Sequence, residues 1–127
     1  MKFTYKKKDK LKSRKLIEKL FDEGKSVTVF PLRMLYLKTT HENGSVIKTG
    51  VSVSKRNFKK AVDRNRVKRL LREAYRLNKP EYFKNITTPY ALMILYIGKD
   101  ANDFNSVNEN LKLLLSAFLE KTSNEKN

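Results

Sequence analysis

The sequence predicts a single α+β domain, in which three helices pack against a small, mostly antiparallel sheet of about four strands. Apolar residues recur at helical spacing in three segments, and runs rich in Val, Ile, Leu, Phe and Tyr alternate with them. The 127 residues suffice for one modest core, with no internal repeat or interdomain linker. We expect the element order α-β-β-β-α-β-α within residues 13–121, between a flexible basic arm (1–12) and a polar tail (122–127).

The first elements are marked by a cap, a stop and a break. Ser13 is a plausible N-cap, and Gly24 ends a helix whose apolar stripe consists of Leu16, Ile17, Leu20 and Phe21. Residues 27–38 are extended in pattern, and Pro31 divides them into two strands. Asn43-Gly44 is a strong hairpin signal, so we expect 32–39 and 46–54 to pair as an antiparallel hairpin.

The second half of the chain contains two further helices and one apolar strand. A helix covers at least Asp63 to Leu77, and Pro80 limits its extension. Residues 90–97 form a nearly continuous apolar run, which is typical of a central strand. The last helix starts near Asn102 or Asp103 and buries the stripe Phe104, Val107, Leu111, Leu114, Leu115 and Phe118.

The charge of the chain restricts its partners. Twenty-nine Lys and Arg against 13 Asp and Glu give a net charge of +16, which favours a polyanionic partner such as nucleic acid. A membrane partner is disfavoured because no apolar run approaches the roughly 20 residues that span a bilayer. The basic start lacks the apolar stretch of a secretory signal, so we expect a cytoplasmic protein.

One helix concentrates the positive charge. On the helix at 63–77 the core arc consists of Val67, Leu70, Leu71 and Ala74. The opposite face carries Asn65, Arg69, Arg72 and Arg76 in one row, flanked by Lys68, and only Glu73 offers local neutralisation. Guanidinium groups one turn apart suit phosphate binding, whereas ordinary solvated faces mix both signs. We therefore interpret the row as an RNA-binding surface.

An irregular segment precedes this helix. Residues 55–62 do not continue the core arc, and Phe58, Ala61 and Val62 project nearer the basic side. We expect a loop that presents the cations to a folded RNA backbone. The predicted RNA-binding residues are Lys55, Arg56, Lys59, Lys60, Arg64, Asn65, Arg66, Lys68, Arg69, Arg72 and Arg76.

The segment Arg64–Glu73, preceded by the strand Gly50–Lys55, resembles the signature of the bacterial ribonuclease P protein. The resemblance covers most of the chain, more loosely beyond Pro80, and implies the fold of that family, which is similar to that of some ribosomal proteins. The chain departs from the family pattern at Lys59-Lys60, where the family usually has Gly, and at Ile17, which replaces an aromatic residue.

The resemblance implies a subunit of ribonuclease P, in which a large RNA is the catalyst and the protein assists removal of the 5′ leader from precursor tRNA. It implies one protein per RNA, contact of residues 55–76 with that RNA, and Mg²⁺ held by the RNAs rather than tightly by the protein. It also implies that a cleft between the first helix and the sheet receives the single-stranded leader. Aromatic side chains stack on single-stranded bases, so Phe21, Phe30 and Tyr36 are candidates to line the cleft. Ile17, at a position where the family has an aromatic residue, is the fourth candidate.

The chain shows no catalytic or metal-binding motif of its own. It has no Cys, His41 is the single histidine, and the acids are scattered. Three other readings remain open: a structural ribosomal or ribosome-assembly protein, a DNA-binding regulator, and a nuclease acting alone. The basic helix offers few side chains for reading base edges, which disfavours the regulator.

Overall fold

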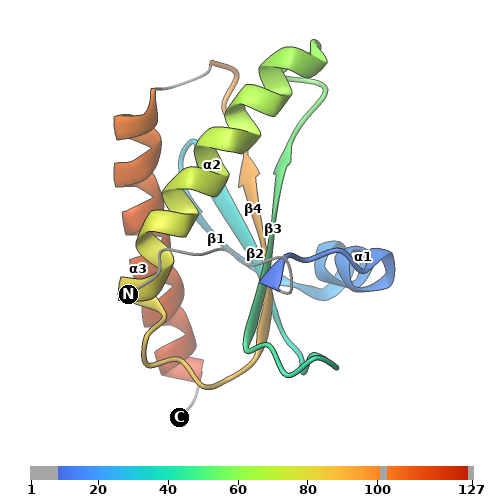
Figure 1. Ribbon diagram of the computed structural model, residues 1–127, viewed down its shortest axis with the longest axis vertical. Coiled ribbons are helices and arrows are strands. Elements are labelled where there is room, and N and C mark those ends of the chain that lie inside the picture. The colour runs from blue at the N-terminus through green and yellow to red at the C-terminus, as the bar shows by residue number, and fades with distance from the viewer. Residues whose placement is uncertain (1–8, 101–102, 126–127) are drawn as a thin grey trace.

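The computed structural model describes residues 9–100 and 103–125, which fold as three helices and a four-stranded sheet (Figure 1). The order of elements matches the expected one. The elements are α1 (Arg14–Glu23), β1 (Lys25–Val29), β2 (Leu32–Lys38), β3 (Ile47–Val53), α2 (Ala61–Tyr82), β4 (Tyr90–Tyr96) and α3 (Phe104–Glu125).

The sheet is mixed, with the strand order β1-β2-β4-β3. β4 pairs antiparallel with β2 and parallel with β3, so that Ile94 lies between Met34 and Val51. The expected pairing of 32–39 with 46–54 is therefore wrong, although Gly44 does form a turn with a φ of 80°. The physical reason is burial: β4 is apolar along its whole length, so it takes the centre, between β2 and β3.

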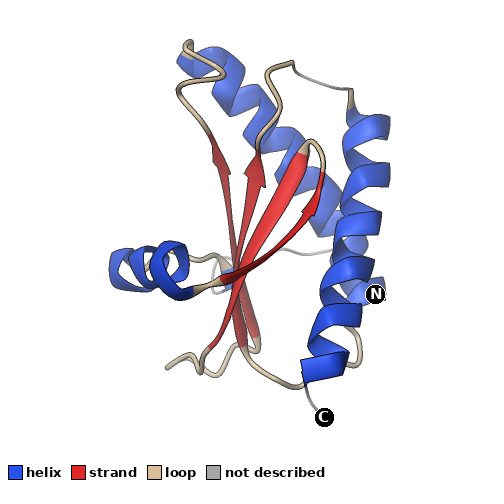
Figure 2. Cartoon of the chain, turned by 180° about the vertical axis from the view of Figure 1, so that it is seen from behind, coloured by secondary structure: helices blue, strands red, loops and turns tan. Residues whose placement is uncertain are grey.

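Helices cover the two faces of the sheet unequally. Figure 2 shows α2 and α3 on one face and α1 on the other. The face under α2 and α3 carries the main core, which includes Val67, Leu71 and Phe118. On the other face, Leu20 of α1 packs with Leu35 and Met93 in a smaller core, which leaves part of the sheet uncovered by α1.

Tyr36 lies in the main core and not beneath α1. Its side chain is only 3% exposed, and its ring makes edge contacts with Phe118 at 5.2 Å and with Tyr90 at 6.2 Å between centroids. Even-numbered residues of β2 therefore face α3, while Leu35 and Leu37 face α1.

The ends of the helices follow local chemistry. The Ser13 hydroxyl accepts a hydrogen bond from the Leu16 amide, and Asp103 caps α3 by accepting one from the Ser106 amide. The α2 helix runs through Pro80 to Tyr82, further than expected, because a proline in the last turn costs one backbone hydrogen bond and the Phe83 amide still reaches the Lys79 carbonyl.

Both predicted flanking segments are partly built into the domain. Leu11 is buried, and its amide donates to the Thr49 carbonyl on the edge of β3. At the other end Thr122 is buried within α3, where its hydroxyl donates to the Phe118 carbonyl. The packed domain thus extends beyond residues 13–121 on both sides, while the rest of the predicted arm, residues 1–8, lies outside the described residues.

Replacing Tyr36 with Ala is expected to lower the free energy of unfolding by about 3 to 5 kcal/mol, since it empties a large aromatic site in the core. Phe30→Ala is the control, because its ring is 70% exposed and its loss should change stability by less than about 0.5 kcal/mol. Urea denaturation of both variants measures the difference. Equal midpoints for the two variants would contradict the assignment of Tyr36 to the core.

Candidate nucleic-acid interface

The turn between β3 and α2 is held in place by polar contacts at both ends. The Ser54 hydroxyl accepts from the Arg56 amide at 3.0 Å, and the Asn57 side-chain amide donates to the Ile97 carbonyl at 3.2 Å. Phe58, expected near the basic side, is instead buried, with its ring 5.8 Å from that of Tyr96. An aromatic ring anchors the turn in the core, so the turn's cations are fixed to the domain.

Four predicted RNA-binding residues lie exposed on this turn: Lys55, Arg56, Lys59 and Lys60. A fifth, Arg64 in the first turns of α2, has a different role in the free protein. Its guanidinium Nη1 donates to the Phe58 and Lys59 carbonyls, both at 2.8 Å. Arg64 therefore ties the turn to the helix, so that the two form one rigid basic surface.

The outer face of α2 carries the predicted row. Asn65, Arg66, Arg69 and Arg72 are exposed. Of the predicted core arc, Val67, Leu71 and Ala74 are fully buried and Leu70 is partly buried. Lys68 is half-buried at the flank. Like charges one turn apart repel each other in an isolated helix. The burial of the opposite face is what holds these cations together in the absence of a polyanion.

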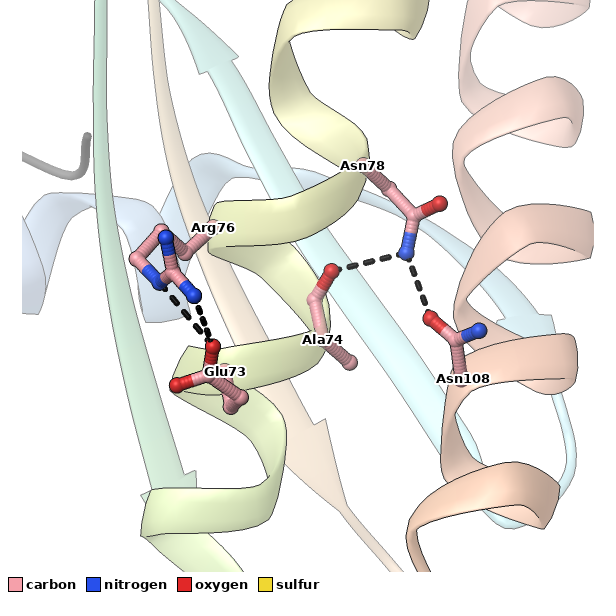
Figure 3. A network of polar contacts seen from close by, with 5 residues as sticks. All are labelled: Glu73, Ala74, Arg76, Asn78 and Asn108. Atoms are coloured by element: carbon pink, nitrogen blue, oxygen red, sulfur yellow. Dashed lines mark hydrogen bonds and ion pairs between the residues drawn. The ribbon is translucent and has the colours of Figure 1, made fainter. Parts of the chain in front are cut away.

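Arg76, at the end of the row, differs from its neighbours because a carboxylate holds it. Its Nε and Nη2 atoms both donate to one carboxylate oxygen of Glu73, the first at 3.0 Å (Figure 3). One turn further on, the Lys79 ammonium lies 3.2 Å from a carboxylate oxygen of Asp9. The two cations at the carboxyl-terminal part of α2 are thus each paired with an acid.

A groove of about 570 Å³ lies between α1 and the uncovered part of the sheet. Phe21 stands at one side of it, with half of its side chain (53%) exposed. The remaining lining residues come from β3, the β3–α2 turn and β4: Ser52, Ser54, Lys55, Arg56, Asn57, Leu95, Tyr96 and Ile97. The groove combines an aromatic ring, hydroxyls and two cations, which is the chemistry that binds a single-stranded nucleic acid.

The other three predicted cleft residues do not line this groove. Ile17 is half-buried and packs between α1 and the sheet. Tyr36 faces the opposite side of the sheet, as described above, so its assignment to the cleft is wrong. Phe30 is exposed on the β1–β2 turn, where it lines a neighbouring hollow of about 450 Å³ with Pro31 and Gly98. The two hollows share Tyr96 and Ile97.

Sequence reasoning missed the serines of the groove. Val51 and Val53 point to the main core, so the strand alternation places Ser52 and Ser54 on the α1 face. This alternation was readable in the sequence. The position of the two serines in a groove could not be predicted, because it depends on which part of the sheet α1 leaves uncovered.

In the described part of the chain, no three side chains of His, Asp or Glu converge as a metal site would require. None of its helices is both long and apolar enough to cross a membrane.

The model of the ribonuclease P family matches residues 5–119. A ribonuclease P protein component from Porphyromonas gingivalis is 47% identical over 77 residues, which cover 61% of this chain but only 56% of that protein. The chain therefore spans little more than half the length of this relative. The corresponding protein of Dictyoglomus turgidum is 32% identical over 111 residues, with 86% of this chain and 87% of the relative covered.

Solved structures agree with these sequence matches. The ribonuclease P protein of Thermotoga maritima superimposes with a TM-score of 0.66 at 27% identity, over 84% of this chain and 96% of that one. The Staphylococcus aureus protein, at 18% identity, shares the fold with a TM-score of 0.67 over 86% of this chain and 94% of that one. With its signature on the exposed face of α2 and the match of the family over most of its length, the chain belongs to the ribonuclease P protein family.

Proposed function

We propose that this chain is the RNA-binding subunit of a ribonuclease P holoenzyme and assists its RNA in removing the 5′ leader from precursor tRNA. The observation that carries the proposal is the continuous basic surface formed by the β3–α2 turn and the outer face of α2, next to an aromatic-lined groove. Family membership supports the same role. One protein per RNA is part of the proposal.

The basic surface suits the RNA subunit. Its cations are spread over a rigid turn and more than two helical turns, so they can follow a folded phosphate backbone rather than a single phosphate. Arg and Lys side chains that neutralise phosphates release condensed counterions, which makes binding strong and dependent on salt. Because the turn is anchored through Phe58 and Arg64, little ordering is needed when RNA arrives.

The groove suits the single-stranded leader. Phe21 offers a face for base stacking, the hydroxyl of Ser52 can donate to or accept from a base edge, and Lys55 and Arg56 can meet phosphates at the rim. The two cations belong to both surfaces, since they lie on the turn that separates the groove from α2. A leader in the groove would thus lie close to the RNA bound along α2.

The chemistry is assigned to the RNA subunit in this proposal. Mg²⁺ would be held by RNA phosphates and by the substrate, and would supply the activated water and the stabilisation of the leaving oxygen. The protein's part is to bind the leader, to orient it, and to lower the repulsion between two polyanions through its positive surface.

Arg69→Ala combined with Arg72→Ala is expected to weaken binding to the ribonuclease P RNA and to flatten its salt dependence. Each phosphate contact contributes about 0.9 to the slope of log K against log salt on duplex-like RNA, so the slope should fall by nearly two. The control is Lys38→Ala with Lys84→Ala, which removes the same charge at two exposed positions away from the row. An equal loss of slope in both double variants would show that net charge, and not the row, determines binding.

Phe21→Ala is expected to weaken the binding of precursor tRNA by the holoenzyme while leaving mature tRNA binding unchanged. Stacking on an aromatic ring contributes about 1 to 3 kcal/mol per base, and only the precursor carries the leader. Because Phe21 is half exposed, its truncation should leave the fold intact. Leu113→Ala, at a similarly exposed apolar position on α3, is the control. If the ratio of the two affinities is the same in both variants, Phe21 is not a leader contact.

The purified protein, freed rigorously from RNA, is expected to cut no precursor tRNA with or without Mg²⁺. Cleavage should appear when the ribonuclease P RNA is added, and it can be followed by gel electrophoresis of the released leader. Site-specific cleavage by the protein alone would place the chemistry in this chain and refute the proposed division of roles.

A further inference from the structure

The cations of α2 fall into two groups that differ in their pairing with acids. Arg76 is held by the Glu73 carboxylate through two of its nitrogens, in a pair about 36% and 48% exposed (Figure 3). Lys79 is held by Asp9, whose other carboxylate oxygen accepts from the Ser45 hydroxyl at 3.1 Å. Both acids lie at the carboxyl-terminal half of the helix.

In the amino-terminal group, Asp63 lies in the first turn of the helix, but no acid of the described chain forms an ion pair with these cations. Among residues 9–100 and 103–125, no carboxylate lies within ion-pair distance of Arg66, Lys68, Arg69 or Arg72. Glu73 lies four residues after Arg69 and three residues before Arg76, so it could meet either guanidinium, and it pairs with Arg76. The change from unpaired to paired cations therefore occurs between Arg72 and Arg76.

This change matters because salt-dependent RNA binding depends on net positive charge. A cation that is already paired with a carboxylate adds little net positive charge to the protein surface. Its contact with a phosphate therefore releases few of the counterions condensed on the RNA. A phosphate approaching Arg76 would also meet the like charge of Glu73 unless the pair opened. The pair thus counts as nearly neutral to a polyanion.

We infer that the RNA footprint on α2 ends at Arg72, and that Glu73 sets this boundary by holding Arg76. The inference rests on the proposed function, and it removes Arg76 from the row that the sequence predicted to bind RNA. Glu73 then limits the part of α2 that binds the RNA backbone, although Glu73 itself does not contact the RNA.

The test compares the salt dependence of binding to the ribonuclease P RNA for four variants of the full chain. Arg72→Ala should lower the slope by about 0.9. Arg76→Ala alone should lower it too, since it leaves the Glu73 carboxylate available to Arg69, whereas Glu73→Gln with Arg76→Ala removes the pair as a unit and should leave the slope within error of the parent. Glu73→Gln removes the carboxylate charge beside Arg76 while keeping the size of the side chain, so it should steepen the slope by about 0.9 and tighten binding at low salt. Adding Arg76→Ala to Glu73→Gln should abolish that gain.

The outcomes separate this inference from the proposed function. If Glu73→Gln with Arg76→Ala lowers the slope as much as Arg72→Ala does, the boundary is wrong but the RNA surface stands. A gain in Glu73→Gln that survives the added Arg76→Ala would show that Glu73 acts through its general field, and would also overturn the inference. If neither arginine variant changes the slope, the proposed RNA surface itself fails. Thermal unfolding of all four variants checks that each is folded, which the exposure of both side chains leads us to expect.

Discussion

The pairing of β4 with strands of opposite direction on its two sides is the constraint on which the structure depends. A parallel neighbour cannot be reached by a tight turn, so the chain between β3 and β4 must cross over the sheet. α2 is that crossover. The helix that contains the family signature is therefore fixed at both ends by strands of the sheet. The β3–α2 turn, with its four cations, is held where β3 ends, beside Ile97, the residue that follows β4.

The unequal covering of the sheet follows from the sizes of the helices. α2 and α3 each have 22 residues and bury the whole of one face under an aromatic core. α1 has 10 residues and buries only a patch around Leu20 on the other face. The part of the sheet that α1 does not reach becomes the floor of the groove. The short first helix thus leaves this groove open.

The sequence predicted the elements well because their signals are local. The cap at Ser13, the stop at Gly24 and the break at Pro31 each depend on a few neighbouring residues. Strand pairing could not be predicted in the same way, since β4 inserts between two strands that are joined by a turn signal. The role assigned to Tyr36 failed for a related reason. β2 is apolar on both faces, so alternation alone does not tell which side meets α1.

The electrostatic design of α2 is a balance between folding and binding. Like-charged pairs one turn apart cost an isolated helix roughly 0.2 to 0.5 kcal/mol each, whereas burying a side chain such as Leu71 contributes about 1.5 to 3 kcal/mol. The buried face therefore outweighs the repulsion, and the helix forms before any RNA is present. The repulsion remains as unfavourable energy on the outer face, which a phosphate backbone bound there, as we propose, would relieve. Pairing Arg76 and Lys79 with acids confines that energy to the amino-terminal half of the helix, next to the basic turn and the groove.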